Sequence, residues 1–271
     1  MSSETAGGTS NEKSAVERDG RVLRCRISTG RHGTLDGPAM QEVGAALEKL
    51  AGQDPADPDS VGAVLLHGDG DNFCTGGDVR AFAGAEDRYA YVHALADTFH
   101  ALQRPLATAP VPTVAAVAGW AAGAGMSVVL ACDIAVGGRS TRMRPAYPGI
   151  GFSPDGGMSW TLPRLVGMAR ARRILLTDEV LEADTLTELG LLASVVDDDA
   201  VAEEAAATAH RLAQGPTAAL GQIRNLLAGT WEMSFAEQLD AESDSIATCA
   251  AGPEGAEGLA AFGEKRRPRF H

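Results

Sequence analysis

Residues 112–137, PTVAAVAGWAAGAGMSVVLACDIAVG, contain three kinds of pattern in succession. Residues 112–119 are almost entirely small and apolar, which is typical of a buried strand. Residues 120–133 begin with glycines and end as a helix of small residues, and residues 134–138 return to a strand pattern. A strand, a glycine-rich turn, a helix and another strand in this order indicate an α/β fold.

A second glycine-rich loop follows a buried strand further upstream. Residues 61–68 (VGAVLLHG) predict the strand, and residues 69–78 (DGDNFCTGGD) form the loop. Glycine lets the backbone approach a ligand closely, and two N–H groups that converge on one oxygen form an oxyanion hole. Taken singly, each glycine cluster is better explained as a tight turn. Neither loop matches a dinucleotide-binding or P-loop pattern, so nucleotide binding of those kinds is not expected.

The rest of the chain continues the alternation of strands and helices. We expect further strands at residues 21–28 and 190–199, and helices at residues 37–50, 89–106, 156–165 and 169–177. Helical patterns dominate from residue 200 onward. The sequence therefore predicts an α/β core at residues 20–198 and a helical C-terminal region at residues 199–271. Residues 1–19 are polar and lack the apolar core of a signal peptide, so we expect a disordered arm there.

The composition excludes several classes of protein. The chain has 271 residues, 45% of them hydrophobic and 22% charged, which is typical of a globular protein. A net charge of −13 argues against a nucleic-acid binder, because such proteins need a basic face. No apolar run reaches the roughly 20 residues that span a bilayer, so no membrane association is expected.

Cysteines and histidines give no sign of a metal site. Four scattered cysteines without a C-x-x-C pair predict neither a disulfide framework nor a zinc site, which fits a reducing cytoplasm. His93 and His100 are seven residues apart on a predicted helix, and a solvated face explains them better than metal binding. We therefore expect no metal.

Several of these segments together resemble the crotonase superfamily, the enoyl-CoA hydratase/isomerase family. The two loop segments, VLLHGDGDNFCTGGDVRAF and PTVAAVAGWAAGAGMSVVLACDIAVG, look like the family's two oxyanion loops. GIGFSPDGGMSWTLPRLVGMARARRILLT and the terminal EGLAAFGEKRRPRF continue the match, which covers nearly everything from Arg21 to Phe270. The resemblance implies a crotonase-like spiral of ββα units with a helical C-terminal trimerisation region.

The resemblance also implies the chemistry of the two loops. Members of the family bind acyl-CoA thioesters and stabilise a thioester enolate, with coenzyme A as part of the substrate and no separate cofactor. By position, the N–H donors of the oxyanion hole would be Gly77, directly after Gly76, and Ala124. The family usually has glycine at the second place, but alanine still offers its N–H if the local φ is tolerated.

The two glutamates of the family's hydratase branch are missing. By position, Ser127 replaces the first and Tyr147 replaces the second. Neither a serine nor a tyrosine is a competent general base near neutral pH without activation. A standard hydratase mechanism is therefore not expected from this sequence.

Asp155 in GIGFSPDGG (residues 149–157) is the candidate that remains. An aspartate at this place shuttles a proton in the family's isomerase branch and acts as a nucleophile in a dehalogenase branch. A Pro-Asp-Gly-Gly stretch before a helical run is also typical of a helix N-cap. The two loops and the family match favour catalysis over the cap, and one carboxylate can serve both roles.

Five further residues are candidates for contact with the substrate: Gly76, Asp78, Ser127, Tyr147 and Lys265. For Asp78, fixing the loop is the stronger interpretation. For Ser127, packing near the site is stronger, and Tyr147 either lines the acyl pocket or donates a proton. Lys265 lies in a basic spot, and C-terminal basic residues of the family can reach the phosphates of coenzyme A, sometimes in a neighbouring subunit.

The sequence and the resemblance together predict an enoyl-CoA isomerase that shifts a double bond through an enolate. Asp155 would be the acid/base, and Gly77 and Ala124 the oxyanion donors. A hydratase, a hydrolase or dehalogenase with Asp155 as nucleophile, and a non-catalytic acyl-CoA binder remain alternatives. We expect a cytoplasmic homotrimer or dimer of trimers with an acyl-CoA thioester as its partner.

Overall fold

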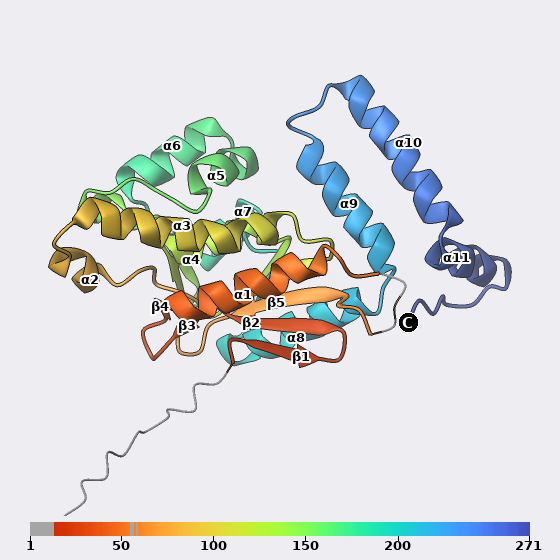
Figure 1. Cartoon of the computed structure of the whole chain (residues 1–271), viewed down its shortest axis with the longest axis horizontal. Helices are drawn as coiled ribbons and strands as arrows, with labels where there is room; N and C mark the ends of the chain where they lie inside the picture. The colour runs from red at the N-terminus through yellow and green to blue at the C-terminus, as the bar shows by residue number, and fades with distance from the viewer. Residues whose placement is uncertain (1–13, 55–56, 58) are drawn as a thin grey trace, which may run out of the picture.

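The strands of the protein form one central sheet and two smaller ones (Figure 1). The computed structural model describes residues 14–54, 57 and 59–271. Its strands are β1 (Val16–Asp19), β2 (Val22–Arg26), β3 (Ser28–Thr29), β4 (Thr34–Leu35), β5 (Ala63–His67), β6 (Thr113–Val117), β7 (Trp120–Ala122), β8 (Ile134–Gly138), β9 (Arg142–Arg144), β10 (Leu181–Glu182) and β11 (Ser194–Val196). The central sheet has the order β1-β2-β5-β6-β8-β11, and all its neighbours are parallel except β1 and β2. The smaller sheets are β10-β9-β7 and β3-β4.

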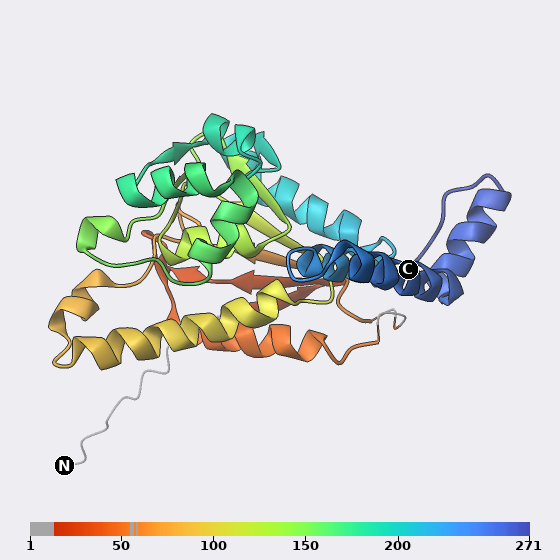
Figure 2. The same cartoon turned by 90° about the horizontal axis from the view of Figure 1, so that it is seen from above.

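Helices cover both faces of the central sheet (Figures 1 and 2). They are α1 (Gly37–Leu50), α2 (Val79–Gly84), α3 (Arg88–Ala107), α4 (Ala124–Ala131), α5 (Met158–Val166), α6 (Met168–Thr177), α7 (Ala183–Glu188), α8 (Val201–Ala213), α9 (Thr217–Gly229), α10 (Phe235–Ala251) and α11 (Pro253–Gly263). Two short 3-10 turns lie at Pro148–Ile150 and Asp198–Ala200. The α1–α3 pair lies on one side of the sheet and α8 on the other.

The strand residues divide between two apolar cores because side chains alternate along a strand. Val64 and Leu66 of β5 belong to the larger core, which α1, α3 and α4 complete. Ala63 and Leu65 of the same strand face α8 and form the smaller core. Burial on both faces explains why β5 and β6 are continuous apolar runs, as parallel strands usually are.

The structure confirms the predicted α/β fold and most of its elements. The predicted helix at residues 37–50 and the strand at residues 134–138 have the observed bounds, and α3, α5 and α6 agree within two residues. The short strands β4, β7, β9 and β10 were not predicted, because two or three residues are too few to display a period.

Two predicted boundaries were wrong. The expected disorder at residues 1–19 is wrong for residues 16–19, because β1 pairs with β2 along its whole length, from Val16 opposite Cys25 to Asp19 opposite Val22. Residues 1–13 lie outside the described part of the chain. The predicted boundary at residue 199 assigns α8 to the C-terminal helical region. In the structure α8 belongs to the α/β core, because Val201, Ala205 and Ala209 pack in the smaller apolar core against the central sheet.

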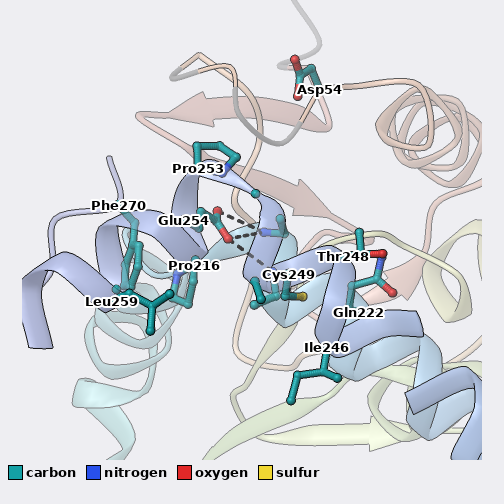
Figure 3. Close-up of a pocket in the computed structure, with 16 residues that line it drawn as sticks. Asp54, Pro216, Gln222, Ile246, Thr248, Cys249, Pro253, Glu254, Leu259 and Phe270 are labelled. Atoms are coloured by element: carbon teal, nitrogen blue, oxygen red, sulfur yellow. Dashed lines mark hydrogen bonds between the residues drawn. The ribbon is translucent and has the colours of Figure 1, made fainter. Parts of the chain in front are cut away.

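The helices that leave the core are α9, α10 and α11, at the opposite end of the molecule from α2 (Figures 1 and 2). Arg224 of α9 ties this part to the core, since its Nε donates to Asp133 at 2.6 Å. The Glu254 carboxylate accepts hydrogen bonds from the N–H groups of Ala218 and Ala219, so α11 caps the N-terminus of α9 (Figure 3). A cavity of about 520 Å³ lies between these helices.

Candidate active site

The two glycine-rich loops meet at a backbone contact. Cys74 and Ala121 form a parallel bridge, in which the N–H of Ala122 donates to the Cys74 carbonyl at 2.8 Å. A side chain at Gly125 would run into the same carbonyl, so the start of α4 can lie this close only with glycine there. The loops therefore lie side by side, with a Cβ built on Gly76 only 3.9 Å from the Ala124 nitrogen.

Two backbone N–H groups at this contact have no acceptor. Those of Gly77 and Ala124 make no hydrogen bond to any described residue, whereas the neighbouring N–H of Gly123 donates to the Arg144 carbonyl at 3.0 Å. Ala124 begins α4, where the first N–H groups have no intrahelical acceptor. The backbone of Ala124 is right-handed, so alanine adopts it without strain. The condition that the sequence analysis placed on an alanine donor is therefore met. Two free donors side by side are the arrangement that binds an oxyanion.

A cavity of about 660 Å³ opens beside these donors. Gly77 and Ala124 line it, and so does Asp155, which comes from a third segment of the chain. Among the described residues that line this cavity, Asp155 is the one carboxylate. The remaining walls are mostly apolar side chains from α2, α3 and the segment before Asp155, including Val79, Leu95 and Ile150. The cavity thus combines two hydrogen-bond donors, a carboxylate and a mostly apolar wall that also includes Arg88 and His93.

The Asp155 side chain does not cap a helix. Helix α5 begins after Gly157, and no side chain caps its N-terminus in the described structure. Instead, Asp155 Oδ1 accepts a hydrogen bond from the Tyr147 hydroxyl at 2.7 Å. The alternative of a simple N-cap is therefore wrong for this carboxylate.

Tyr147 holds its proton firmly. Its side chain is 9% exposed, and this burial, followed by the adjacent Asp155 carboxylate, raises the pKa of the phenol well above its usual range. At neutral pH the proton therefore stays on Tyr147, which donates it to the hydrogen bond with Asp155. This bond leaves the second carboxylate oxygen, Oδ2, for other partners.

Three buried or half-buried side chains hold the backbone around Asp155. Ser127, 1% exposed, donates to the Asp155 carbonyl at 3.0 Å. Gln103 donates to the Gly156 carbonyl at 2.7 Å, and the N–H of Gly156 donates to His100 Nε2 at 3.2 Å. The predicted solvated face was wrong for His100, which is half-buried against this loop. The sequence did carry a signal for these contacts. Positions 100 and 103 are polar in the same part of α3 that buries Phe99 and Leu102.

Tyr147 is positioned by a strained residue and a half-buried carboxylate. Ala146 has φ +61°, a backbone conformation that is uncommon for residues other than glycine. Its N–H donates to Asp178 Oδ1 at 2.8 Å, and Arg144 Nη2 donates to Asp178 Oδ2 at 2.5 Å. Because the Arg144 carbonyl also accepts from Gly123, Asp178 supports a segment that joins the second loop to Tyr147.

Comparison with known proteins decides the family. The family model described as enoyl-CoA hydratase/isomerase matches residues 21–271. The chain belongs to the enoyl-CoA hydratase/isomerase family. It is an acyl-CoA enzyme of the crotonase fold, as the sequence predicted.

Relatives in this family carry different activities in their names. The chain is 36% identical to a 1,2-epoxyphenylacetyl-CoA isomerase of Escherichia coli, covering 78% of this chain and 82% of the relative. It is 31% identical to a 4-chlorobenzoyl coenzyme A dehalogenase of Arthrobacter, covering 93% and 90%. Among solved structures, an enoyl-CoA hydratase from Polaromonas superposes with a TM-score of 0.86 at 30% identity, covering 94% and 98%.

The structure separates the predicted contact residues of this crotonase into two groups. Gly76 and Tyr147 line the cavity. Ser127 lies behind Asp155 and does not line the cavity, which agrees with the interpretation that it packs near the site. The Asp78 carboxylate accepts hydrogen bonds from the N–H groups of Arg80 and Ala81 and caps α2, which agrees with the interpretation that it fixes the loop.

Lys265 lies far from the cavity within one chain. It follows α11 and is exposed, whereas the cavity is bounded by α2 and α3 at the other end of the molecule (Figures 1 and 2). Within a single chain Lys265 is therefore remote from this cavity, and its contact with coenzyme A stays a prediction.

Neither a membrane-spanning helix nor a metal-binding cluster is found among the described residues. No helix among them is long and apolar enough to cross a bilayer. No group of three or more histidine, cysteine, aspartate or glutamate side chains among them is arranged to hold a metal ion.

Removal of the Asp178 carboxylate from this crotonase should slow turnover, and a glycine should restore it. We expect Asp178→Ala to lower kcat about tenfold, because an unsupported left-handed alanine costs about 1–2 kcal/mol and Tyr147 follows it directly. The double variant Ala146→Gly/Asp178→Ala should recover most of kcat, because glycine adopts this φ freely. Steady-state kinetics on an acyl-CoA substrate measure both effects.

The matched control is Glu182→Ala, which breaks the nearby exposed ion pair with Arg142 and should leave kcat unchanged. A double variant as slow as Asp178→Ala alone would contradict the role of Ala146 strain.

Proposed function

We propose that this protein is an enoyl-CoA isomerase, which moves a double bond along the acyl group through a thioester enolate. The observation that carries the proposal is the single carboxylate of the cavity, Asp155, placed with the free N–H groups of Gly77 and Ala124 around the same space. One carboxylate is enough to remove a proton from one carbon and return it to another, whereas hydration needs a second group to activate or protonate.

In the proposed reaction the thioester oxygen accepts hydrogen bonds from Gly77 and Ala124. Asp155 takes a proton from the α-carbon of a 3-enoyl thioester, and the electrons of the broken C–H bond form the enolate. The negative charge collects on the thioester oxygen, where each donor contributes about 3–4 kcal/mol of stabilisation. The protonated Asp155 then returns the proton at the γ-carbon, which leaves a 2-enoyl thioester and regenerates the carboxylate.

Tyr147 and Ser127 support this assignment because neither is free to act as a second acid or base. Ser127 is buried behind Asp155, and its proton is engaged by the Asp155 carbonyl. The proton of Tyr147 is engaged by the Asp155 carboxylate, and its pKa is raised. The E. coli relative is named as an isomerase, which agrees with the proposal.

The decisive experiment incubates the protein with trans-3-enoyl-CoA and trans-2-enoyl-CoA esters in deuterated water. We expect conversion of the 3-enoyl to the 2-enoyl ester, with deuterium in the product from the fraction of protonated Asp155 that exchanges with solvent before it returns the proton. NMR and mass spectrometry measure the position of the double bond and the deuterium content. A 3-hydroxyacyl-CoA as main product would instead make the protein a hydratase, and release of the free acid would make it a hydrolase. Binding without exchange or turnover would leave a non-catalytic acyl-CoA binder, and an acyl or aryl adduct on Asp155 would make the carboxylate a nucleophile.

We further propose that the chain assembles as a homotrimer or a dimer of trimers in the cytoplasm. Large apolar side chains are exposed along the C-terminal helices: Ile223, Leu227, Phe235, Leu239, Ile246, Leu259 and Phe262. Such a surface favours a protein partner. In such an assembly Lys265 would reach the coenzyme A phosphates of a neighbouring subunit. Free cysteines agree with a reducing compartment. Sedimentation as a monomer at micromolar concentration would refute the assembly.

A further inference from the structure

Aromatic side chains are concentrated around the candidate active site. The chain has seven phenylalanines and three tyrosines, and half of them line the cavity beside Asp155: Phe82, Tyr89, Phe99, Tyr147 and Phe152. Aromatic residues make up only 5% of the chain. These five side chains form an aromatic wall of the cavity, and the chemistry of the ligand should account for it.

Two of these rings lie next to the reacting atoms of the proposed reaction. Phe82 lies directly against the first oxyanion residue, since a Cβ built on Gly77 would be 2.7 Å from Phe82 Cζ. Phe152 stacks on Phe82, with ring centroids 6.0 Å apart and planes inclined by 19°. Phe152 precedes Asp155 by three residues, and its N–H donates to the Tyr147 carbonyl at 3.0 Å. The pair therefore extends from the first oxyanion donor to the segment that carries the base.

This placement determines which part of the acyl group meets the rings. The thioester oxygen lies at Gly77 in the proposed complex, so the carbons that follow the carbonyl lie beside Phe82. A planar ring attached there can make offset or edge-to-face contacts with Phe82 and Phe152, which aromatic pairs prefer at such separations. A linear chain makes only dispersion contacts at this wall and loses the freedom of several rotatable bonds when it binds.

We propose that the acyl group of the substrate carries a planar or largely unsaturated six-membered ring one or two bonds from the thioester carbonyl, as in an arylacetyl-CoA. This inference rests on the proposed function only in placing a CoA thioester in this cavity with its oxygen at Gly77. Phe82 and Phe152 are then the residues that determine specificity for the acyl group.

Binding of two CoA esters with equal numbers of acyl carbons tests the inference. Phenylacetyl-CoA and octanoyl-CoA each carry eight, and their dissociation constants are measured by calorimetry on the wild type and on Phe82→Leu, Phe152→Leu and Trp160→Leu. We expect the wild type to bind phenylacetyl-CoA about tenfold more tightly, the ratio that a favourable aromatic contact supplies. Each phenylalanine variant should lower this ratio about fivefold, because leucine keeps the apolar volume and removes the ring.

Trp160→Leu is the matched control, because Trp160 is 53% exposed and does not line the cavity, so its variant should keep the wild-type ratio. The ratio compares two esters on one protein, so a general loss of folded protein cancels. Equal or tighter binding of octanoyl-CoA, or an unchanged ratio in both phenylalanine variants, overturns the ring preference. If a ring preference is found but the protein converts no 3-enoyl-CoA ester to its 2-enoyl isomer, the ring inference stands and the proposed isomerase function fails.

Discussion

Asp155→Asn is expected to lower the rate of double-bond isomerisation by about 10²–10⁴-fold, the range that a positioned general base supplies. Asparagine has nearly the same shape as aspartate, and its carbonyl oxygen can still accept the hydrogen bond from the Tyr147 hydroxyl. The loop geometry should therefore survive while the base is lost. Exchange of substrate protons with deuterated water should fall by the same factor as isomerisation, because both depend on the same proton transfer.

The matched control is Asp87→Asn. Asp87 caps α3 by accepting from the Ala90 N–H and does not line the cavity, and asparagine caps a helix equally well. This variant should retain full activity. If Asp155→Asn folds normally, as judged by circular dichroism and binding of a CoA ester, and still isomerises at the wild-type rate, Asp155 is not the base.

Ala124→Pro should reduce kcat by about 10²–10³-fold, because it deletes one oxyanion donor and little else. Ala124 is the first residue of α4, where proline is favoured and where the lost N–H makes no helix hydrogen bond. Gly123 precedes it with φ +56°, and glycine tolerates the restriction that a following proline imposes. The helix should therefore form normally, so the effect reports on the N–H group.

Ala124→Gly provides the comparison, since it changes the same side chain and keeps the N–H. It should retain kcat within a few-fold. Dissociation constants of a CoA ester, measured on both variants, separate a lost donor from a blocked cavity: a lost donor lowers kcat while ground-state binding changes much less. Equal kcat values for the proline and glycine variants would mean that the Ala124 N–H does not stabilise the enolate.

Much of the site was visible in the sequence because its parts are local. The glycine loops after two buried strands, the Asp155 segment and the absence of the hydratase glutamates at Ser127 and Tyr147 can all be recognised from short stretches. Regular periods likewise predicted α1, α3 and β8, because a helix or a strand imposes its repeat on consecutive residues.

The supporting side chains escaped prediction because they act on the backbone of distant segments. Gln103 binds Gly156, and Asp178 binds the N–H of Ala146, 32 residues away. A side chain that accepts from or donates to a distant backbone group leaves no repeat and no motif around itself. The same holds for β1, whose polar residues pair with β2 through the backbone, with one further ion pair between Asp19 and Arg24.

The sequence by itself determined the family, the α/β fold and the one carboxylate with a claim to the chemistry. Only the tertiary structure decided where the Asp155 carboxylate lies, since the same PDGG stretch is compatible with a helix cap. The bridge between Cys74 and Ala121 brings the free N–H groups of the two loops together, and Tyr147 draws the Asp155 carboxylate away from the start of α5. Local pattern specifies elements, whereas the direction of one side chain depends on partners that only folding brings within hydrogen-bond distance.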